Sequence, residues 1–325
     1  MTLQPPKRMV LIGARGYVGQ ELLQLIAQHE HIDLLLASSS TQSGQPIASL
    51  LPEWPDEQCF VKLKQEEVRG LDADVWVLAV PNEQSRAWAE VIRQAHPDCV
   101  ILDLGADFRF EPDWVYGLTE WNRAALSSAK SIANPGCYAT GAQLGLMPIR
   151  ELLASPPVIF GVSGYSGAGR TPSPRNDPER LADNLIPYAL GGHVHEREIS
   201  QHLGRMVRFY PHVAGFFRGL TLTIAVRLTE PVDQADLLQR FEHVYGNEPL
   251  IHTAEKIPEI RDLQPRVTVR IGGFSVDGRD AHRACFVVVL DNLLKGAASQ
   301  ALQNINLALG YDELHAVLHS NELTS

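Results

Sequence analysis

A cysteine at a predicted strand–helix junction is the residue of this chain best placed to act as a nucleophile. Residues 131–133 form a short apolar strand, residues 134–136 (Asn-Pro-Gly) make a turn, and Cys137 opens a helix predicted over 137–149. A helix dipole stabilises a thiolate at the helix N-terminus, so such a thiol is nucleophilic at neutral pH. A free cysteine is more often a small buried hydrophobic residue, and we interpret three others in that way: Cys59, Cys99 and Cys285.

Two histidines are candidates for the acid–base partner of this thiol. His193 and His195 follow the glycine pair at 191–192 and precede a helix predicted over 196–203. Histidine titrates near neutral pH, which suits proton transfer. We favour His195, because it lies nearer the start of the helix. The pair could instead be structural, or it could bind a metal ion, but no further ligand accompanies it at a suggestive spacing and no metal site is predicted.

A glycine-rich turn near the N-terminus predicts a dinucleotide site. Gly13, Gly16 and Gly19 lie between an apolar strand at 9–12 and an amphipathic helix at 20–28. Glycines there let the backbone approach a pyrophosphate at a helix N-terminus, where N–H groups favour anions. The spacing is GxxGxxG, a variant of GxGxxG, and the alternative is a tight turn that binds nothing.

The end of the second strand predicts which dinucleotide binds. Ser38, Ser39, Ser40 and Thr41 stand where an NAD-specific site usually has Asp or Glu. Neutral hydroxyls tolerate a 2′-phosphate, and Arg15 could add positive charge. NADP(H) is therefore the predicted cofactor, although the serines could simply form a solvated loop.

The segments that must position these residues divide the chain into two parts. In the first part, short apolar strands alternate with helical stretches, which is typical of a doubly wound parallel α/β sheet. These strands are predicted at 9–12, 32–37, 74–80 and 99–104. In the second part, strands at 219–228, 266–271 and 284–290 indicate a largely antiparallel sheet with one face in water. We expect a helix over 234–245 to cover the other face, and a last helix over 291–309.

Composition excludes several classes of protein. The 325 residues are 45% hydrophobic and 20% charged, as in ordinary globular proteins. The net charge of −10 argues against binding to nucleic acid or to an anionic membrane. The four cysteines have no CxxC spacing, so neither a disulfide framework nor a zinc cluster is indicated. No apolar run approaches the ~20 residues that cross a bilayer, and we expect a soluble cytoplasmic protein.

Six segments, in their order along the chain, resemble the N-acetyl-gamma-glutamyl-phosphate reductase family of the semialdehyde dehydrogenase group. Each is modest alone, but together they are highly specific, and the resemblance extends from Met9 to about Gly310. The segments are 13–19, 102–109, 134–138, 163–170, 193–195 and 291–298. Members of this family use NADPH to reduce N-acetyl-glutamyl 5-phosphate to N-acetyl-glutamate 5-semialdehyde, with release of phosphate, in arginine biosynthesis.

The resemblance implies a Rossmann-like cofactor domain interrupted by an α+β catalytic domain. Residues 1–136 and 291–325 would bind the dinucleotide, and residues 137–290 would bind the substrate and form a homo-oligomer, a dimer or a tetramer. Cys137 would expel phosphate and form a thioester, to which NADPH would deliver hydride. His195, or else His193, would transfer the proton.

The resemblance also implies which residues bind the two small molecules. The cofactor-binding residues would be Gly13, Arg15, Gly16, Tyr17, Val18, Gly19, Ser38, Ser39, Ser40, Pro81, Gly167, Asn292 and Lys295. The substrate-binding residues would be Arg109, Asn134, Ser163, Gly164 and Arg170. The two arginines are the expected clamps for a phosphate or carboxylate, because guanidinium groups bind such anions in bidentate geometry. Arg109 could instead pair with Asp103 or Asp107 and order its loop.

Two other classes of function are compatible with these features. A sister reductase acting on aspartyl phosphate or aminoadipyl phosphate would use the same thiol chemistry, and only its acyl-binding pocket would differ. A non-catalytic NADP-binding regulator would keep the fold, but it would have no reason to retain both Cys137 and His195. The partners expected are therefore a small acyl phosphate and inorganic phosphate, with no nucleic acid, no membrane and no metal ion.

Overall fold

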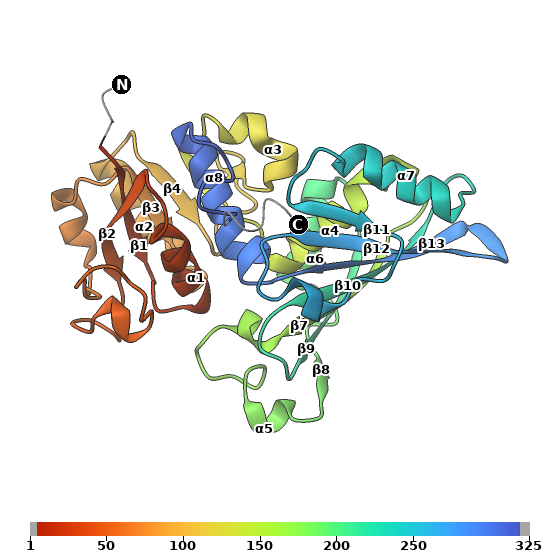
Figure 1. The fold of residues 1–325 in the computed structure, drawn as a ribbon, viewed down its shortest axis with the longest axis horizontal. Coiled ribbons are helices and arrows are strands. Elements are labelled where there is room, and N and C mark those ends of the chain that lie inside the picture. The colour runs from red at the N-terminus through yellow and green to blue at the C-terminus, as the bar shows by residue number, and fades with distance from the viewer. Residues whose placement is uncertain (1–4, 319–325) are drawn as a thin grey trace. The chain divides into compact units, whose positions relative to one another are not determined.

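The computed structural model describes residues 5–318, which form two compact units (Figure 1). The first unit combines the chain up to Pro135 with the chain from Ala297 onward, and the second unit is Gly136–Gly296. The second unit is thus inserted into the first. The boundaries expected from the sequence, 136/137 and 290/291, lie within a few residues of these.

Residues 291–296 account for most of the difference between the expected and observed boundaries. The Asp291 carboxylate accepts two hydrogen bonds from the Arg218 guanidinium, at 2.5 and 3.1 Å. The side-chain oxygen of Asn292 accepts the Gly219 N–H at 2.6 Å. Because both partners belong to the second unit, these bonds hold the segment there rather than in the first unit.

The first unit contains a parallel sheet with six strands in the described residues, in the order β2-β1-β3-β4-β6-β5. The strands are β1 (Lys7–Ile12), β2 (Ile32–Ser38), β3 (Val75–Leu78), β4 (Val100–Asp103), β5 (Val115–Tyr116) and β6 (Ser131–Ala133). All residues of β3 and β4 are buried, as expected for a parallel sheet covered on both faces. The doubly wound sheet predicted from the alternation of strands and helices is therefore confirmed.

The helices of the first unit come from both ends of the chain. They are α1 (Tyr17–Ile26), α2 (Ser85–Ala95), α3 (Thr119–Leu126) and α8 (Ser299–Leu309), with short 3₁₀ turns η1 (Ile47–Ser49) and η2 (Gln65–Gly70). The last helix, α8, packs against α3 and α1 (Figure 1). The side-chain amides of Gln300 and Asn304, both buried in α8, donate to the Gly117 carbonyl at 2.9 and 2.8 Å. The C-terminal helix thus completes the core of this unit.

The helix predicted over 291–309 begins later than expected. The chain forms a π-helical turn, η6 (Leu294–Ala298), and only then the α-helix α8. The Asp291 carboxylate accepts the N–H groups of Leu293 and Leu294, at 2.9 and 3.2 Å. An aspartate that bonds to nearby N–H groups in this way competes with helical hydrogen bonding, which explains the later start.

The second unit is built on a mixed sheet with seven strands in the described residues, in the order β11-β12-β13-β10-β7-β9-β8. Four of the six pairings within residues 5–318 are antiparallel, and β7–β9 and β11–β12 are parallel. The strands are β7 (Val158–Gly164), β8 (Leu185–Pro187), β9 (Arg208–Ala214), β10 (Leu220–Arg227), β11 (Ile251–Ala254), β12 (Val269–Asp277) and β13 (Asp280–Leu290). The largely antiparallel sheet is confirmed, but β12 and β13 extend beyond the predicted strands and form one long hairpin.

The helices of the second unit leave one face of the sheet uncovered. They are α4 (Cys137–Leu146), α5 (Pro178–Leu181), α6 (Val194–Leu203) and α7 (Gln234–Tyr245), with 3₁₀ turns η3 (Met147–Leu152), η4 (Tyr165–Ala168) and η5 (Ile260–Leu263). In β10, Leu222 and Ile224 are buried whereas Thr223 and Ala225 are exposed. This alternation confirms a sheet with one face in water. No helix within residues 5–318 combines the length and the apolarity needed to span a membrane.

Two glycines allow α4 to lie directly on the sheet. A Cβ atom added to Gly145 would lie 2.8 Å from a Val288 methyl group and 2.9 Å from the end of Ile224. A Cβ atom added to Gly141 would lie 2.9 Å from Leu222. The close approach buries every residue of α4 after Cys137, so this helix is a rigid part of the core.

The aromatic cluster under α7 should account for much of the stability of the second unit. Phe241 is wholly buried, and its ring centroid lies 4.9 Å from that of Phe274 and 5.3 Å from that of Phe286. Phe241→Ala leaves a cavity, so the free energy of unfolding measured by urea denaturation should fall by ~3–5 kcal/mol. Met206→Ala is the control, because Met206 is 75% exposed and its loss should change that free energy by less than about 0.5 kcal/mol. Equal effects of the two substitutions would contradict the assignment of the cluster to the core.

Candidate active site

Cys137 is the first residue of α4, as the sequence predicts. Gly136 precedes it as the N-cap and supplies no side chain to bond the first N–H groups of the helix. Cys137 is partly exposed although the rest of α4 is buried. The helix therefore presents an accessible thiol at the end where its dipole favours the thiolate.

Two of the other cysteines lie in surroundings that suppress ionisation. Burial raises the pKa of the Cys99 thiol to about 11. Burial also raises the pKa of the Cys285 thiol, whereas Cys59 is exposed in a loop. These settings agree with the interpretation of Cys99 and Cys285 as structural residues. The interpretation of Cys59 as a buried residue is wrong, because its loop leaves it exposed.

Helix α6 contacts the N-terminal end of α4. Glu198 of α6 is fully buried, and its Oε1 accepts the Gly136 N–H at 2.9 Å. His195 lies three residues before Glu198 on the same helix, and residues at this spacing share a helix face. The His195 ring also lies 5.9 Å from the ring of Tyr138, the residue after Cys137. The structure thus brings His195 to the end of α4 that holds the thiol.

His193 caps α6 instead of occupying its face. The helix begins at Val194, and the Nδ1 atom of His193 accepts the His195 N–H at 3.1 Å. Burial, with a smaller contribution from the Arg175 charge, lowers the pKa of His193 to about 4. At neutral pH His193 is therefore a neutral residue that orients His195 through the helix start.

The sequence analysis gave no individual role to Tyr138, Tyr188 or Arg175. Burial is the main cause that raises the pKa of Tyr138 well above its usual range and that of Tyr188 to about 12, and the charge of Cys137 contributes to both shifts. The Tyr138 hydroxyl donates to the His212 carbonyl at 2.7 Å. The Arg175 guanidinium lies 5.0 Å from the centre of the Tyr188 ring. The position of Tyr188 just before the glycine pair at 191–192 was the available signal, whereas no motif in the sequence singled out Arg175.

The segment at 163–169 is tied to Asn292, which was predicted as a cofactor residue. The Asn292 side-chain nitrogen donates to the Ser166 hydroxyl at 2.9 Å, and its oxygen accepts the Gly219 N–H. A Cβ atom added to Gly164 would lie 2.5 Å from the Phe217 carbonyl oxygen. The structure therefore brings Asn292 and the predicted substrate residue Gly164 to one loop cluster.

The remaining predicted residues of this unit belong to the same two segments, 163–170 and 291–298. The Ser163 hydroxyl is buried and donates to the Gly164 carbonyl at 3.0 Å. A Cβ atom on Gly167 would lie 3.2 Å from the Ser163 hydroxyl. Arg170 is half-buried, and Lys295 is completely buried.

Gly296 lets the chain pass next to the thiol. A Cβ atom added to Gly296 would lie 2.7 Å from the Cβ atom of Cys137. The segment is held there by the ion pair between Arg218 and Asp291, whose carboxylate is fully buried. Neither partner was predicted, because the sequence places them more than seventy residues apart. The ion pair therefore holds the 291–296 segment next to the thiol.

In the first unit, the two segments predicted to bind the dinucleotide lie together. The Ser38 carbonyl at the end of β2 accepts the N–H groups of Gly13 and Ala14, both at 3.0 Å. Gly13 has φ +91°, and a Cβ atom there would lie 2.2 Å from the Ala79 carbonyl oxygen. Only glycine fits this turn, which leads into α1 with no side-chain cap.

The residues around this turn fit a phosphorylated dinucleotide. Among Ser38–Thr41 there is no carboxylate to repel a 2′-phosphate, and Arg15 is only half-buried. The hydroxyl oxygens of Ser38 and Ser39 accept N–H groups of Leu63 and Gln42, at 3.4 and 3.2 Å. Ser40 is exposed, as is Pro81 beyond β3, while Tyr17 and Val18 begin α1. Ser40 is thus the predicted serine most accessible to a ligand.

Arg109 and Asn134 lie in the first unit, and their side chains form hydrogen bonds with other residues of that unit. The Arg109 guanidinium donates to the carbonyls of Asn134 and Leu104, at 2.9 and 3.2 Å. The Asn134 side chain donates to the Ala297 carbonyl and accepts from Asn304, at 3.2 and 3.1 Å. These bonds give both residues a structural role just before the strand–helix junction at Cys137.

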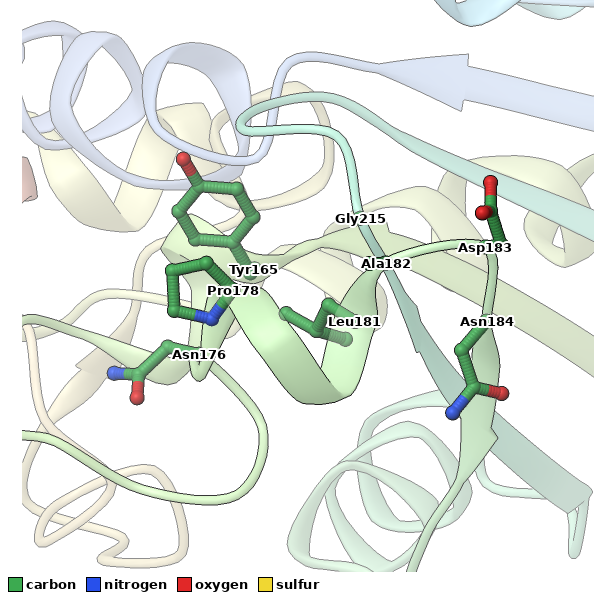
Figure 2. Close-up of a pocket in the computed structure, with 8 residues that line it drawn as sticks. All are labelled: Tyr165, Asn176, Pro178, Leu181, Ala182, Asp183, Asn184 and Gly215. Carbon is green, nitrogen blue, oxygen red and sulfur yellow. The ribbon is translucent and has the colours of Figure 1, made fainter.

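A pocket of about 410 Å³ opens elsewhere in the second unit (Figure 2). It is lined by Tyr165, Gly215 and residues between 176 and 184. Figure 2 shows the Leu181 side chain of α5 between Tyr165 and Asn184. The lining thus joins Tyr165 of η4 and Gly215 to α5 and the chain around it.

Comparison with known proteins assigns both units to one family. Residues 8–129 match the family described as "Semialdehyde dehydrogenase, NAD binding domain", and residues 137–292 match "Semialdehyde dehydrogenase, dimerisation domain". The first match confirms the prediction of a nicotinamide dinucleotide as cofactor. The first matched range lies within the first unit, and the second lies within the second unit.

The chain is also similar to individual proteins. It is 46% identical to the N-acetyl-gamma-glutamyl-phosphate reductase of Xanthomonas campestris pv. campestris, over 98% of this chain and 100% of that protein. Among solved structures, a probable aspartate-semialdehyde dehydrogenase from Pseudomonas aeruginosa has a TM-score of 0.78 at 21% identity, covering 94% of this chain and 99% of that one.

A second solved structure, aspartate semialdehyde dehydrogenase with NADP from Candida albicans, has a TM-score of 0.69 at 15% identity and covers 96% of this chain and 100% of that one. At such low identities the two structures support the fold alone. The sequence similarity to the reductase is much stronger, and it confirms the resemblance seen in the sequence motifs. The chain therefore belongs to the semialdehyde dehydrogenase family of oxidoreductases.

Proposed function

We propose that this chain uses NADPH to reduce N-acetyl-glutamyl 5-phosphate to N-acetyl-glutamate 5-semialdehyde, with release of inorganic phosphate, as a step of arginine biosynthesis. The main support is the accessible Cys137 thiol at the start of a buried helix, with His195 and Glu198 of α6 against that end. The 46% identity to a reductase named for this substrate supports the choice of acyl phosphate.

The thiol performs the covalent step. The Cys137 thiolate attacks the acyl carbonyl carbon, the carbon–oxygen bond to phosphate breaks, and a thioester forms. NADPH, when bound, supplies the hydride that reduces the thioester carbonyl carbon. The thiolate then leaves from the resulting thiohemiacetal, and the semialdehyde is released. A thiol suits both the first and the last step of this reaction, because its thiolate is a good nucleophile and a good leaving group.

His195 holds and moves the proton. It protonates the oxygen that gains negative charge when the thioester is reduced, and it takes the proton back when the thiohemiacetal collapses. His193 orients it by capping α6, and Glu198 holds Gly136 and so positions the thiol. His193 and Glu198 are therefore positioning residues in this proposal.

Arginines on the second unit bind the anionic groups of the substrate. Arg170 follows the loop of Ser163 and Gly164, and we assign it the substrate phosphate or carboxylate. Arg175, whose guanidinium lies over the Tyr188 ring, is a further cation of this unit. Arg109 acts through the backbone that leads to Cys137, because its guanidinium donates to the Asn134 carbonyl. The Asn134 side chain joins that segment to Ala297 and Asn304.

The uncovered face of the seven-stranded sheet supports a homo-oligomer. Phe160, which is 40% exposed, and Val287 lie on either side of Thr223 in the sheet register. Apolar side chains on an exposed sheet face favour association with another copy of the chain. The match of this unit to a dimerisation domain agrees with that. We place the enzyme in the cytoplasm.

Replacement of the thiol should nearly abolish turnover. The reverse reaction, phosphate-dependent reduction of NADP⁺ with N-acetyl-glutamate 5-semialdehyde, measures it directly. Cys137→Ser should lower kcat more than tenfold, a loss above ~1.4 kcal/mol of transition-state stabilisation, and cofactor affinity should not change. Cys59→Ser is the matched control and should keep full activity, because that thiol is exposed and remote in the sequence. Faster turnover of aspartate semialdehyde than of the N-acetylated substrate would instead identify a sister reductase.

The two histidines should differ in their effect on the pH–rate profile. His195→Asn removes the proton carrier and should lower kcat by ~10²–10⁴-fold and flatten one limb of the profile. His193→Asn should be milder and keep both limbs, because asparagine also caps helices and because His193, with a pKa of about 4, is already neutral near pH 7. A larger loss and a flattened limb in His193→Asn would exchange the two roles.

Cofactor preference should depend on the exposed end of the serine segment. NADPH should have a higher kcat/KM than NADH, because no carboxylate there repels the 2′-phosphate. Ser40→Asp adds such a charge and should shift the ratio of the two kcat/KM values toward NADH. Ser43→Asp, at another exposed serine of the same loop, is the control and should change the ratio little. Equal kcat/KM values for the two cofactors in the unmodified enzyme would contradict the assignment.

A further inference from the structure

A cluster of potential metal ligands lies in the first unit, away from the glycine turn in sequence. Glu30 and His31 occupy the turn between α1 and β2, and His315 lies in the segment after α8. One ligand atom from each of the three side chains lies within 4.8 Å of the other two. Two chain segments almost three hundred residues apart in sequence thus place a carboxylate and two imidazoles at one point.

His29 packs against this cluster but is not one of its potential ligands. Its Nε2 atom is hydrogen-bonded to Asn306 Oδ1 at 3.0 Å, and its Nδ1 atom accepts the His31 N–H at 3.1 Å. Both ring nitrogens are therefore engaged. The His29 ring centroid lies 4.6 Å from that of His315, so His29 packs against the ligand and orients it.

The rings of the two ligand histidines are also supported. The His31 ring stacks on the His315 ring at 4.7 Å between centroids and 21° between planes. The Tyr311 ring also packs against the His31 ring, with 5.1 Å between their centroids. Ring packing therefore holds the two imidazoles side by side.

The Nε2 atom of His315 is a buried polar atom that needs a partner. It is buried, and within residues 5–318 it has no hydrogen-bond partner. An imidazole nitrogen buried without a partner is unfavourable, because it has lost water and gained nothing in return. A bound cation would be a partner for a histidine in this position.

We propose that Glu30, His31 and His315 form a binding site for a divalent transition-metal ion of the zinc class. Two imidazole nitrogens and one carboxylate oxygen are a donor set that suits Zn²⁺, with water as the fourth ligand. Imidazole donors disfavour Mg²⁺ and Ca²⁺, which prefer oxygen. Tetrahedral zinc ligands lie roughly 3.4 Å apart, so the exposed side chains of Glu30 and His31 need to move inward by a small rotation.

The metal ion would connect the C-terminal segment to the turn between α1 and β2. A ligand that binds only the folded chain raises its stability in proportion to the logarithm of the ligand concentration. Zinc should therefore raise the thermal midpoint of the first unit, and a chelator should reverse the rise. The site lies outside the groups proposed for catalysis, so its role is structural.

Calorimetric titration of Zn²⁺ tests the site. The full chain carrying Cys137→Ser is the parent, so that the reactive thiol does not bind zinc. The parent should bind one ion per chain at this site. His31→Ala and His315→Ala should each weaken the affinity at least tenfold, since even loss of a residue that only supports a ligand typically costs 10–100-fold. His243→Ala, at an exposed histidine of α7, is the matched control and should leave the affinity unchanged.

Glu30→Gln keeps the result interpretable if His315→Ala perturbs the C-terminal segment. Glu30 is exposed, so its replacement does not threaten the fold, yet it removes the ligand charge and should weaken zinc binding and reduce the rise in thermal midpoint. Unchanged zinc affinity in both Glu30→Gln and His31→Ala would overturn the proposal, as would the absence of binding by the parent. The outcome is independent of turnover, so it does not depend on the proposed function.

Discussion

The burial of α4 against the seven-stranded sheet is the constraint on which the rest of the second unit depends. Every residue from Tyr138 to Leu146 is buried, and two glycines bring the helix axis close to β10 and β13. A helix held in this way cannot shift without opening the core. Its first residue, Cys137, is therefore presented at a fixed place, while its thiol remains partly accessible.

The polar groups around that fixed place are satisfied by segments that are distant in sequence. The Gly136 N–H is bonded by Glu198, sixty-two residues later. Asp291 is paired with Arg218, and Asn292 joins Gly219 to Ser166. Loss of one partner in such a buried network leaves the other unsatisfied, at a cost of ~1–3 kcal/mol. The loops of the site are consequently linked to one another and to the sheet.

The order of strands and helices was predictable because each element has its own local pattern. β1 to β4 follow apolar runs, and α7 has the bounds that its helical spacing indicates. The long β12–β13 hairpin was underestimated, although Asp277-Gly278 at its tip is a turn signal that marks the strand ends. The late start of the last helix could not be read locally, since it depends on Asp291 bonding to both the following N–H groups and Arg218.

The sequence by itself determined the class of each unit and the family, and it singled out the candidate nucleophile and the pair of candidate histidines, because motif spacing and periodicity are properties of contiguous residues. Only the tertiary structure decided that His193 caps α6 and that the His195 ring lies near Tyr138, since both depend on where the chain turns into a helix. It alone placed Arg175 over the ring of Tyr188, and His315 beside His31. Such neighbours are made by packing between segments far apart along the chain, and no pattern of adjacent residues encodes that proximity.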